Sequence, residues 1–365
     1  MNYVPAADPA VWEERASAAF AAAARHAAEN ETKWSRDLAV EIPRQFNEAP
    51  PWNEVLGPVR PRGGPNGLVL RGGHIVAEWG NTHQIDQTFS VAKSYLSILA
   101  GLAFDRGLIR DVHEPVCRSV DDGGFDPPHN DKITWHHLLQ QTSEWEGTLW
   151  GKPDLIDRNR VAGGGPSRGA KKGTHRDLEE PGGFWEYNDV RVNRLSLALL
   201  RLWRRPLPEV FRELVMDPIG ASKDWEWRGY RNSTAMVDDG RAIESVAGGS
   251  HWGGGVFMHA RDQARIGLLM QRGGVWGDRR ILSEDWITRC RQPCPLNASY
   301  GYLWWLNTDR SRYPSAPSGS YNAAGAGGNL IWVDPGHDLV AVLRWTDPAT
   351  MDAFMGLVMA AVMEA

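Results

Sequence analysis

Apolar runs of strand length lie near both ends of this chain, and a mostly helical middle separates them. Residues 67–79 form two such runs around Gly72-Gly73, which predicts a β-hairpin. Residues 302–306, 329–333 and 338–344 predict three more strands, and residues 334–336 (Asp-Pro-Gly) predict a tight turn between the last two. The pattern therefore favours β structure contributed by both ends of the chain.

Helical spacing of apolar positions and local capping signals predict most of the remaining elements. Asp8 and Pro9 indicate an N-cap and first turn, Thr134 a second N-cap, and Gly107 the end of a helix. The helices are expected at residues 8–30, 90–106, 131–141, 191–204, 208–216, 261–272, 283–291 and 350–363.

These elements predict an α+β fold with one antiparallel sheet, built from both chain ends and flanked by helices. Residues 1–115 and 246–365 would form that domain, and residues 116–245 a mostly helical inserted subdomain. Pockets form at such junctions, so we expect the active site between the two parts.

Two segments without clear periodicity complete the chain. Residues 31–63 are rich in proline and arginine and are expected to wrap around the body of the protein. Residues 151–183 form a long, basic, glycine-rich loop, which is either a solvated mobile surface or a lid or rim of the active site.

Composition narrows the class of protein. Hydrophobic residues make up 42% and charged residues 23%, as in ordinary globular proteins, while 18 tryptophans suit a deep core or a carbon-rich pocket. The net charge of −5 gives no reason to expect nucleic acid. The 3 cysteines lack a metal-ligand or C-x-x-C spacing, and no secretory signal or membrane span is apparent. We therefore expect reduced thiols and a cytoplasmic protein without a membrane partner.

The strongest chemical signal is Ser90-Val91-Ala92-Lys93 at the start of an apolar helix. Positions i and i+3 share a helix face, so Lys93 can lie beside the Ser90 hydroxyl and assist its deprotonation. Tyr187 follows a Pro-Gly-Gly turn and precedes a helix, where its phenol could share the proton transfer. The free N–H of Ser90 and the glycine-rich segment 322–329 could supply donors to an oxyanion.

Taken in order, these motifs resemble the serine β-lactamase and penicillin-binding-protein superfamily, in particular its class C-like branch of esterases, D-aminopeptidases and nylon-oligomer hydrolases. Further phrases of that type are residues 133–143 (Ile-Thr-Trp-His-His-Leu-Leu-Gln-Gln-Thr-Ser), residues 251–255 (His-Trp-Gly-Gly-Gly) with residues 260–267, and residues 332–335. The likeness spans about residues 67 to 363.

The resemblance implies a nucleophile at Ser90, a proton partner at Lys93 and a tyrosine base at Tyr187. Ala323, Ala324 and Gly325 match the third family motif, and Ala326 would supply the second oxyanion N–H.

Two positions depart from the family pattern. Asp189 replaces the usual asparagine of Tyr-x-Asn, and could line the pocket, cap the following helix, or do both; it could favour a substrate with an amine. The third motif lacks its basic group and its hydroxyl, which makes penicillinase or carboxypeptidase activity less expected. His251 and Trp252, beside three glycines, are expected to form part of the pocket wall.

No metal or nucleotide motif is present, so no cofactor is expected. The expected function is hydrolysis of a small-molecule ester or amide through an acyl-enzyme on Ser90. An acyltransferase with the same nucleophile and a catalytically silent binding or sensor protein remain alternatives. The sequence does not indicate the oligomeric state.

Overall fold

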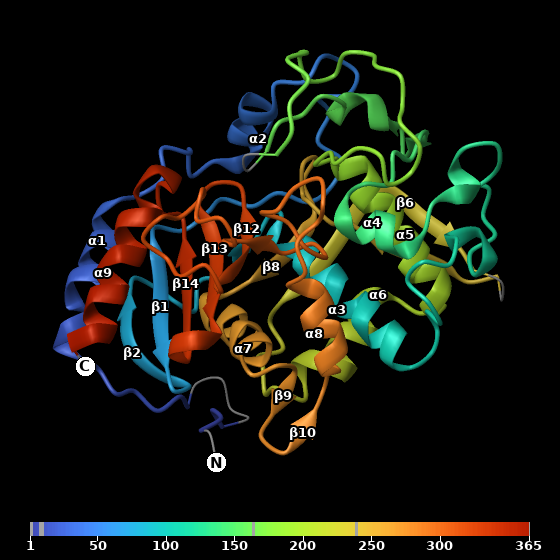
Figure 1. Ribbon diagram of the computed structural model, residues 1–365. Coiled ribbons are helices and arrows are strands. Elements are labelled where there is room, and N and C mark those ends of the chain that lie inside the picture. Colours follow the sequence, from blue (N-terminus) through green and yellow to red (C-terminus); the bar gives the residue numbers. More distant parts are fainter. Residues whose placement is uncertain (1–2, 7–10, 163–164, 238–239, 365) are drawn as a thin grey trace.

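A six-stranded antiparallel sheet joins the two ends of the chain in the computed structural model, which describes residues 3–6, 11–162, 165–237 and 240–364 (Figure 1). Its strand order is β11-β12-β13-β14-β1-β2. The strands are β1 (Asn66–Arg71), β2 (His74–Trp79), β11 (Trp305–Leu306), β12 (Tyr321–Gly325), β13 (Asn329–Asp334) and β14 (Leu339–Arg344).

Strands β14 and β1 make the junction, with Cα register from Asn66 opposite Arg344 to Arg71 opposite Leu339. Every residue of β14 is buried, as expected for a central strand covered on both faces. The predicted hairpin and the antiparallel sheet from both chain ends are therefore confirmed.

Helices cover both faces of this sheet (Figure 1). On one face, α1 (Ala21–Glu29) and α9 (Met351–Glu364) bury an apolar cluster that includes Trp332 and Phe354. On the other, α7 (Ala260–Gln271) and α3 (Val91–Asp105) pack against the sheet. Because α3 lies in this second layer, nearly all of its side chains are buried.

Beyond the sheet lie α4 (Trp135–Gln140), α5 (Asp189–Trp203), α6 (Leu207–Phe211) and a π-helical turn (Arg212–Met216). Thr134 caps α4 as predicted, with its hydroxyl accepting from the His137 N–H at 3.2 Å. Two-stranded ribbons occur at β4–β5 (Thr148–Leu149, Lys152–Pro153) and β9–β10 (Val275–Trp276, Arg279–Arg280), and α8 spans Glu284–Cys290.

A second sheet, with order β3-β8-β6-β7, was not anticipated from the sequence. It consists of β3 (Asp86–Gln87), β8 (Gly255–Met258), β6 (Glu226–Met236) and β7 (Ala242–Val246). Strand β6 alternates buried and exposed side chains only in part, because its register with β7 shifts between Gly229 and Thr234. Since β6 also pairs with β8, strands connect residues 116–245 to the rest of the chain; the proposed subdomain boundaries stay a prediction.

The N-terminal helix is shorter than predicted. Asp8 and Pro9 lie outside the described residues, and α1 begins only at Ala21 after a 3₁₀ turn. Residues 13–17 instead run beside β2, where the Arg15 N–H donates to the Ile75 carbonyl at 2.8 Å. Pairing with the sheet edge thus competes successfully with helix formation.

Within the described ranges, no helix is long and apolar enough to cross a membrane. Cys117, Cys290 and Cys294 are free thiols, as expected.

Close packing of α3 against α8 generates a stability prediction. A Cβ at Gly101 would lie 2.4 Å from the ring of the buried Trp286, whose Nε1 donates to the Ser97 carbonyl. We expect Gly101→Ala to destabilise the protein by about 1–3 kcal/mol, since overpacking outweighs the gain of up to about 1 kcal/mol in helix propensity. Urea unfolding measures this change.

Gly319→Ala is the matched control, because a Cβ there meets no atom within 4 Å and its φ is not positive. It should change the free energy of unfolding by less than about 0.5 kcal/mol. Equal unfolding midpoints for the two variants would show that Trp286 does not restrict position 101.

Candidate active site

Ser90 lies at the start of α3, where the chain leaves a short strand of the second sheet. The preceding residue, Phe89, has φ of +52°, an uncommon conformation for a bulky side chain. Its fully buried ring packs edge-on against Trp34 and Trp345, which hold the strained backbone in place. Ser90 itself remains partly exposed.

Lys93 lies one helical turn further and reaches back to Ser90, with Nζ donating to Oγ at 2.9 Å. Its side chain is 1% exposed. Nζ also lies 2.8 Å from Asp189 Oδ1 and 4.7 Å from the centre of the Tyr187 ring. The predicted trio of Ser90, Lys93 and Tyr187 is therefore brought together, although Lys93 faces the ring of the tyrosine rather than its hydroxyl.

The loop that carries Tyr187 is braced from α4. The side-chain oxygen of Gln141 accepts from the Asn188 N–H at 2.9 Å, and its backbone carbonyl accepts from the Glu186 N–H at 3.0 Å. The Tyr187 ring stacks on Trp305 with centroids 5.4 Å apart. The Gln-Gln-Thr-Ser phrase at the C-terminal end of α4 thus positions the tyrosine loop.

Asp189 faces Lys93 from the first turn of α5. Asn188, not Asp189, is the N-cap, since its side chain accepts from the N–H groups of Val190 and Arg191. Burial would raise the pKa of Asp189, but Lys93, Arg160 and His251 together hold it well below its usual value. Its two oxygens face Lys93 and His251, and the residue is 1% exposed. Asp189 therefore offers no free carboxylate to a substrate amine.

Gly249 makes this close approach possible. A Cβ at that position would lie 2.5 Å from Asp189 Oδ2 and 2.6 Å from Lys93 Nζ. Any side chain there would push the ion pair apart, which explains the need for glycine in the segment before His251.

A charged cluster continues behind Asp189, and we define it as Glu48, Asp157, Arg160, Lys172, Asp189 and His251. The His251 Nδ1 lies 3.4 Å from Asp189 Oδ2, and its Nε2 lies 2.6 Å from Glu48 Oε1. Lys172 pairs with Glu48 at 2.9 Å and with Asp157 at 3.2 Å. Arg160 lies 3.3 Å from both Asp157 and Asp189.

This placement changes the interpretation of two predicted wall residues. The His251 side chain is 0% exposed and Trp252 is 2% exposed. Trp252 stacks on His251 with centroids 4.3 Å apart and donates from Nε1 to Glu48 at 2.8 Å. Both residues thus lie beneath the site, where they support Asp189, instead of lining its surface.

Three members of the charged cluster, Glu48, Asp157 and His251, offer atoms that could ligate a metal, all within 4.8 Å of one another. Lys172 and Arg160 already pair with these carboxylates. Because their positive charges would repel a divalent cation, the arrangement fits an ion-pair network better than a metal centre.

The end of β12 lies against the nucleophile. A Cβ at Gly325 would meet the Thr88 carbonyl at 2.1 Å and the Ser90 nitrogen at 3.2 Å, so only glycine fits. Ala326 follows as a half-buried residue whose carbonyl accepts from the Asn329 side chain at 2.7 Å. Asn329 in turn accepts from the buried Arg344 at 2.6 Å, which fixes this turn. The oxyanion role of the Ala326 N–H stays a prediction.

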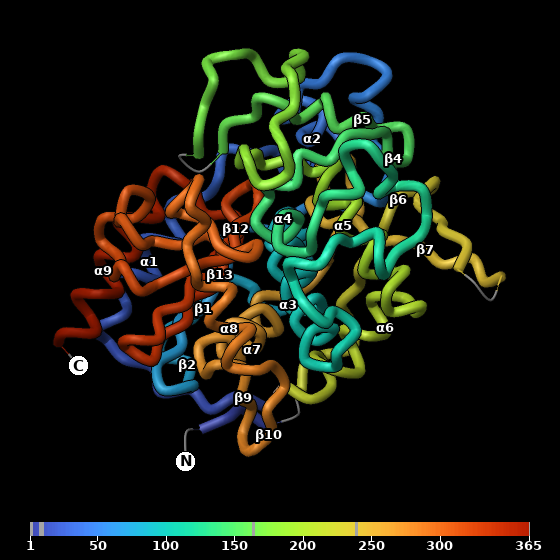
Figure 2. The backbone as a smooth tube through the Cα atoms, turned by 45° about the vertical axis from the view of Figure 1, so that its right-hand side comes forward, coloured from blue at the N-terminus to red at the C-terminus, as the bar shows by residue number. Residues whose placement is uncertain are grey.

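The N-terminal arm, residues 31–63, and the long loop meet above the body of the protein. Both views show α2 (Leu38–Phe46) beside the loop of residues 151–183 (Figures 1 and 2). A cavity of about 410 Å³ separates them, lined among others by Phe46, Trp52, Ile156 and Lys172. The loop also supplies Asp157, Arg160 and Lys172 to the charged cluster, so it borders the site rather than forming only a solvated surface.

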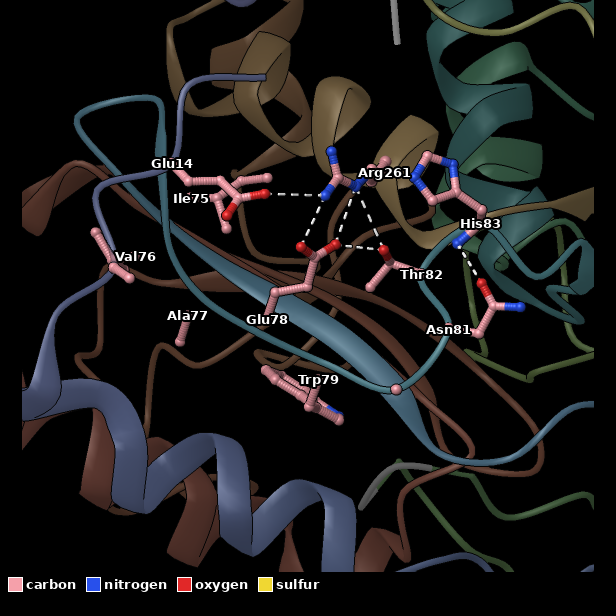
Figure 3. Close-up of a pocket in the computed structure, with 12 residues that line it drawn as sticks. Glu14, Ile75, Val76, Ala77, Glu78, Trp79, Asn81, Thr82, His83 and Arg261 are labelled. Atoms are coloured by element: carbon pink, nitrogen blue, oxygen red, sulfur yellow. Dashed lines mark hydrogen bonds and ion pairs between the residues drawn. The ribbon is translucent and has the colours of Figure 1, made fainter. Parts of the chain in front are cut away.

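A larger cavity, of about 530 Å³, lies elsewhere, along the edge strand β2 (Figure 3). Arg261 crosses it and pairs with Glu78 at 2.7 Å and Glu14 at 3.4 Å. No predicted site residue lines it, and its charges are already paired.

The comparisons with known proteins agree with this architecture. The family model described as beta-lactamase matches residues 68–360, so the chain belongs to the beta-lactamase family. The 6-aminohexanoate-dimer hydrolase of Paenarthrobacter ureafaciens is 26% identical over 322 residues, with 78% of this chain and 73% of that protein covered.

Solved structures share the fold at lower sequence identity. A penicillin-binding-protein homologue from Caulobacter crescentus superposes with a TM-score of 0.59 at 14% identity, covering 95% of this chain and 98% of its own. EstCE1, described as a hydrolase with promiscuous acyltransferase activity, gives a TM-score of 0.59 at 16% identity, covering 94% and 98%. The β-lactamase-like α+β fold is thereby established.

Glu48, Asp157, Arg160 and Lys172 were not singled out by sequence reasoning. Their segments carried a weak signal, as a wrapping arm and a long loop, but no motif marks single positions there. Their roles follow from contacts between residues far apart in the chain.

A second buried cluster anchors the tyrosine loop and yields a pH prediction. Arg176 and Arg191 pair with Glu144 at 2.5 and 2.8 Å. Burial would raise the pKa of Glu144, but these arginines lower it to about 2, from 4.5 in the unfolded chain. Its contribution is therefore fully present above about pH 4.5 and is lost as the pH falls toward 2, in total about 3 kcal/mol.

We expect Glu144→Gln to unfold more readily at neutral pH and to show a flatter loss of stability between pH 4.5 and 2. Urea titrations at several pH values measure both effects. Glu180→Gln removes an exposed partner of Lys132 and serves as the control, with little change expected. An acid slope for Glu144→Gln identical to that of the native protein would contradict the assignment.

Proposed function

We propose that this protein is a serine hydrolase that cleaves an ester or amide of a small molecule through a covalent acyl-enzyme on Ser90. The observation that supports this most is the 2.9 Å contact between Lys93 Nζ and Ser90 Oγ, beside the Tyr187 ring and at a partly exposed helix start. The relatives named as hydrolases support the same class of reaction.

In the proposed acylation, the Ser90 Oγ forms a bond to the carbonyl carbon and its proton passes to the Lys93–Tyr187 pair. The N–H groups of Ser90 and Ala326 bind the oxyanion. The carbon–heteroatom bond then breaks, and the leaving group takes up the proton. Water next attacks the acyl-enzyme and gives a proton to the pair, which returns one to Ser90 as the acid leaves.

The residues of β12 beside Ser90 argue against β-lactams and peptidoglycan as substrates. Ala323 is fully buried in the sheet, and Ala324 is half-buried, so neither offers a charge or hydroxyl to a substrate carboxylate. We therefore propose that the substrates are small esters or amides that need no carboxylate anchor. The proposal includes no cofactor and no nucleic-acid partner.

Acyl transfer is the second candidate, because an amine or alcohol can replace water in the last step. The structural likeness to EstCE1, a hydrolase with promiscuous acyltransferase activity, favours it specifically. A silent binding protein on the same scaffold is the remaining alternative, which the altered third motif keeps open.

Replacing the nucleophile tests this proposal. Ser90→Ala should lower turnover of a p-nitrophenyl ester at least about a thousandfold and abolish labelling by a fluorophosphonate, because it removes the hydroxyl that Lys93 contacts. Initial rates and intact-protein mass measure the two effects.

Ser94→Ala is the control on the same helix, since its hydroxyl donates to the Leu303 carbonyl at 2.7 Å, away from Lys93. It should retain turnover and labelling. Full activity of Ser90→Ala, or a folded native protein that forms no adduct on Ser90, would refute the proposal.

A further inference from the structure

The N-terminal arm supplies Glu48 to the charged cluster and packs Phe46 against it, although the arm precedes the family match at residues 68–360. Glu48 Oε1 lies 2.6 Å from His251 Nε2, and Oε2 accepts from Trp252 Nε1 at 2.8 Å. The Phe46 ring lies over His251 with centroids 4.0 Å apart. The His251 ring is thereby packed between Phe46 and Trp252, with Glu48 at its Nε2 edge.

Carboxylates face both nitrogens of this ring. Nδ1 lies 3.4 Å from Asp189 Oδ2 and 3.7 Å from Asp157 Oδ2, opposite Glu48. A neutral imidazole has one N–H, so its second nitrogen would turn a lone pair toward a carboxylate oxygen. An imidazolium carries a positive charge and an N–H on each nitrogen, so it is attracted to the carboxylates on both sides.

We propose that Glu48 is a positioning residue of the Ser90 site, which acts through a protonated His251 to orient Asp189 and to share the negative charge that Asp189 presents to Lys93. This inference rests on the proposed hydrolase function. The contacts run from Glu48 to His251, Asp189, Lys93 and Ser90, and successive polar atoms are 2.6, 3.4, 2.8 and 2.9 Å apart.

The charge of His251 affects what Asp189 does. One Asp189 oxygen faces His251 while the other faces Lys93 and Arg160. When His251 is protonated it shares the negative charge of Asp189. When it is neutral, Asp189 binds Lys93 more tightly, and a lysine that keeps its proton cannot accept the one on Ser90.

The surroundings favour the protonated form. Burial alone would lower the pKa of His251, but Asp157, Asp189 and Glu48 outweigh it and raise that pKa above its usual value. Lys172 and Arg160 oppose this effect from the loop, since they pair with the same carboxylates. Removing one carboxylate should therefore shift His251 measurably toward its neutral form.

The experiment compares Glu48→Gln with the native protein, using p-nitrophenyl ester turnover from pH 6 to 10. The glutamine keeps an oxygen for Trp252 but loses the charge. We expect the alkaline limb of kcat to move to lower pH by about one unit, which is a tenfold loss on that limb. KM should stay nearly unchanged, because Glu48 lies behind His251 and not at Ser90.

Glu54→Gln is the matched control. Glu54 lies on the same arm and carries the same charge, but its side chain is 61% exposed and pairs with Arg231. It should leave the pH profile unchanged. A Glu48→Gln profile that matches this control, or one lowered equally at every pH, would assign Glu48 a structural role only and overturn the inference.

The NMR titration of His251 ring resonances in the native protein gives a second measurement that needs no active variant. A His251 that is already neutral at pH 7 overturns the inference, even if Glu48→Gln fails to fold. Failure of the hydrolase proposal is distinguishable, because it appears as unchanged turnover or labelling in Ser90→Ala, independent of the His251 titration.

Discussion

The buried ion pair between Lys93 and Asp189 is the interaction on which the site depends. Taking two charges out of water is costly, and their attraction compensates only when further hydrogen bonds satisfy both groups. Here Ser90 accepts from Lys93, while Arg160 and His251 face Asp189. The same contacts that stabilise the pair place the amine beside the hydroxyl, so folding and chemistry impose one geometry.

Separate parts of the chain build this pair. Helix α3 carries Lys93, α5 begins with Asp189, and Gly249 leaves the space between them. The N-terminal arm and the long loop then add Glu48, Asp157, Arg160 and Lys172 behind it. Asp189, the altered residue of the Tyr-Asn-Asp phrase, thus has positively charged partners in Arg160 and His251. An asparagine at position 189 would lack the negative charge that these two residues balance.

Local sequence was sufficient for the parts of the fold that depend on short-range signals. The hairpin around Gly72-Gly73, strands β13 and β14, the Thr134 cap and the Ser90 helix all follow from turn chemistry, capping and periodicity. Strand β12 was not among the predicted strands, and only Trp305–Leu306 of the run 302–306 forms a strand. The second sheet escaped prediction because β6 has a register shift, and the N-terminal helix was overextended because residues 13–17 pair with β2.

The site divides in the same way. Ser90, Lys93, Tyr187 and Asp189 belong to motifs, and the structure brings them together. Glu48 and Lys172 form a contact although they are 124 residues apart in the sequence, and no local pattern encodes it. His251 was noticed through its glycine neighbours, yet only the structure shows that it lies beneath Asp189.

A crystal structure of the protein after reaction with a phosphonate ester would test the central claim most directly. We expect a phosphorus bonded to Ser90 Oγ, a phosphonyl oxygen between the N–H groups of Ser90 and Ala326, and Lys93 still paired with Asp189. Phosphorus on another residue, or Lys93 separated from Asp189 with its amine turned away from Ser90, would contradict the account.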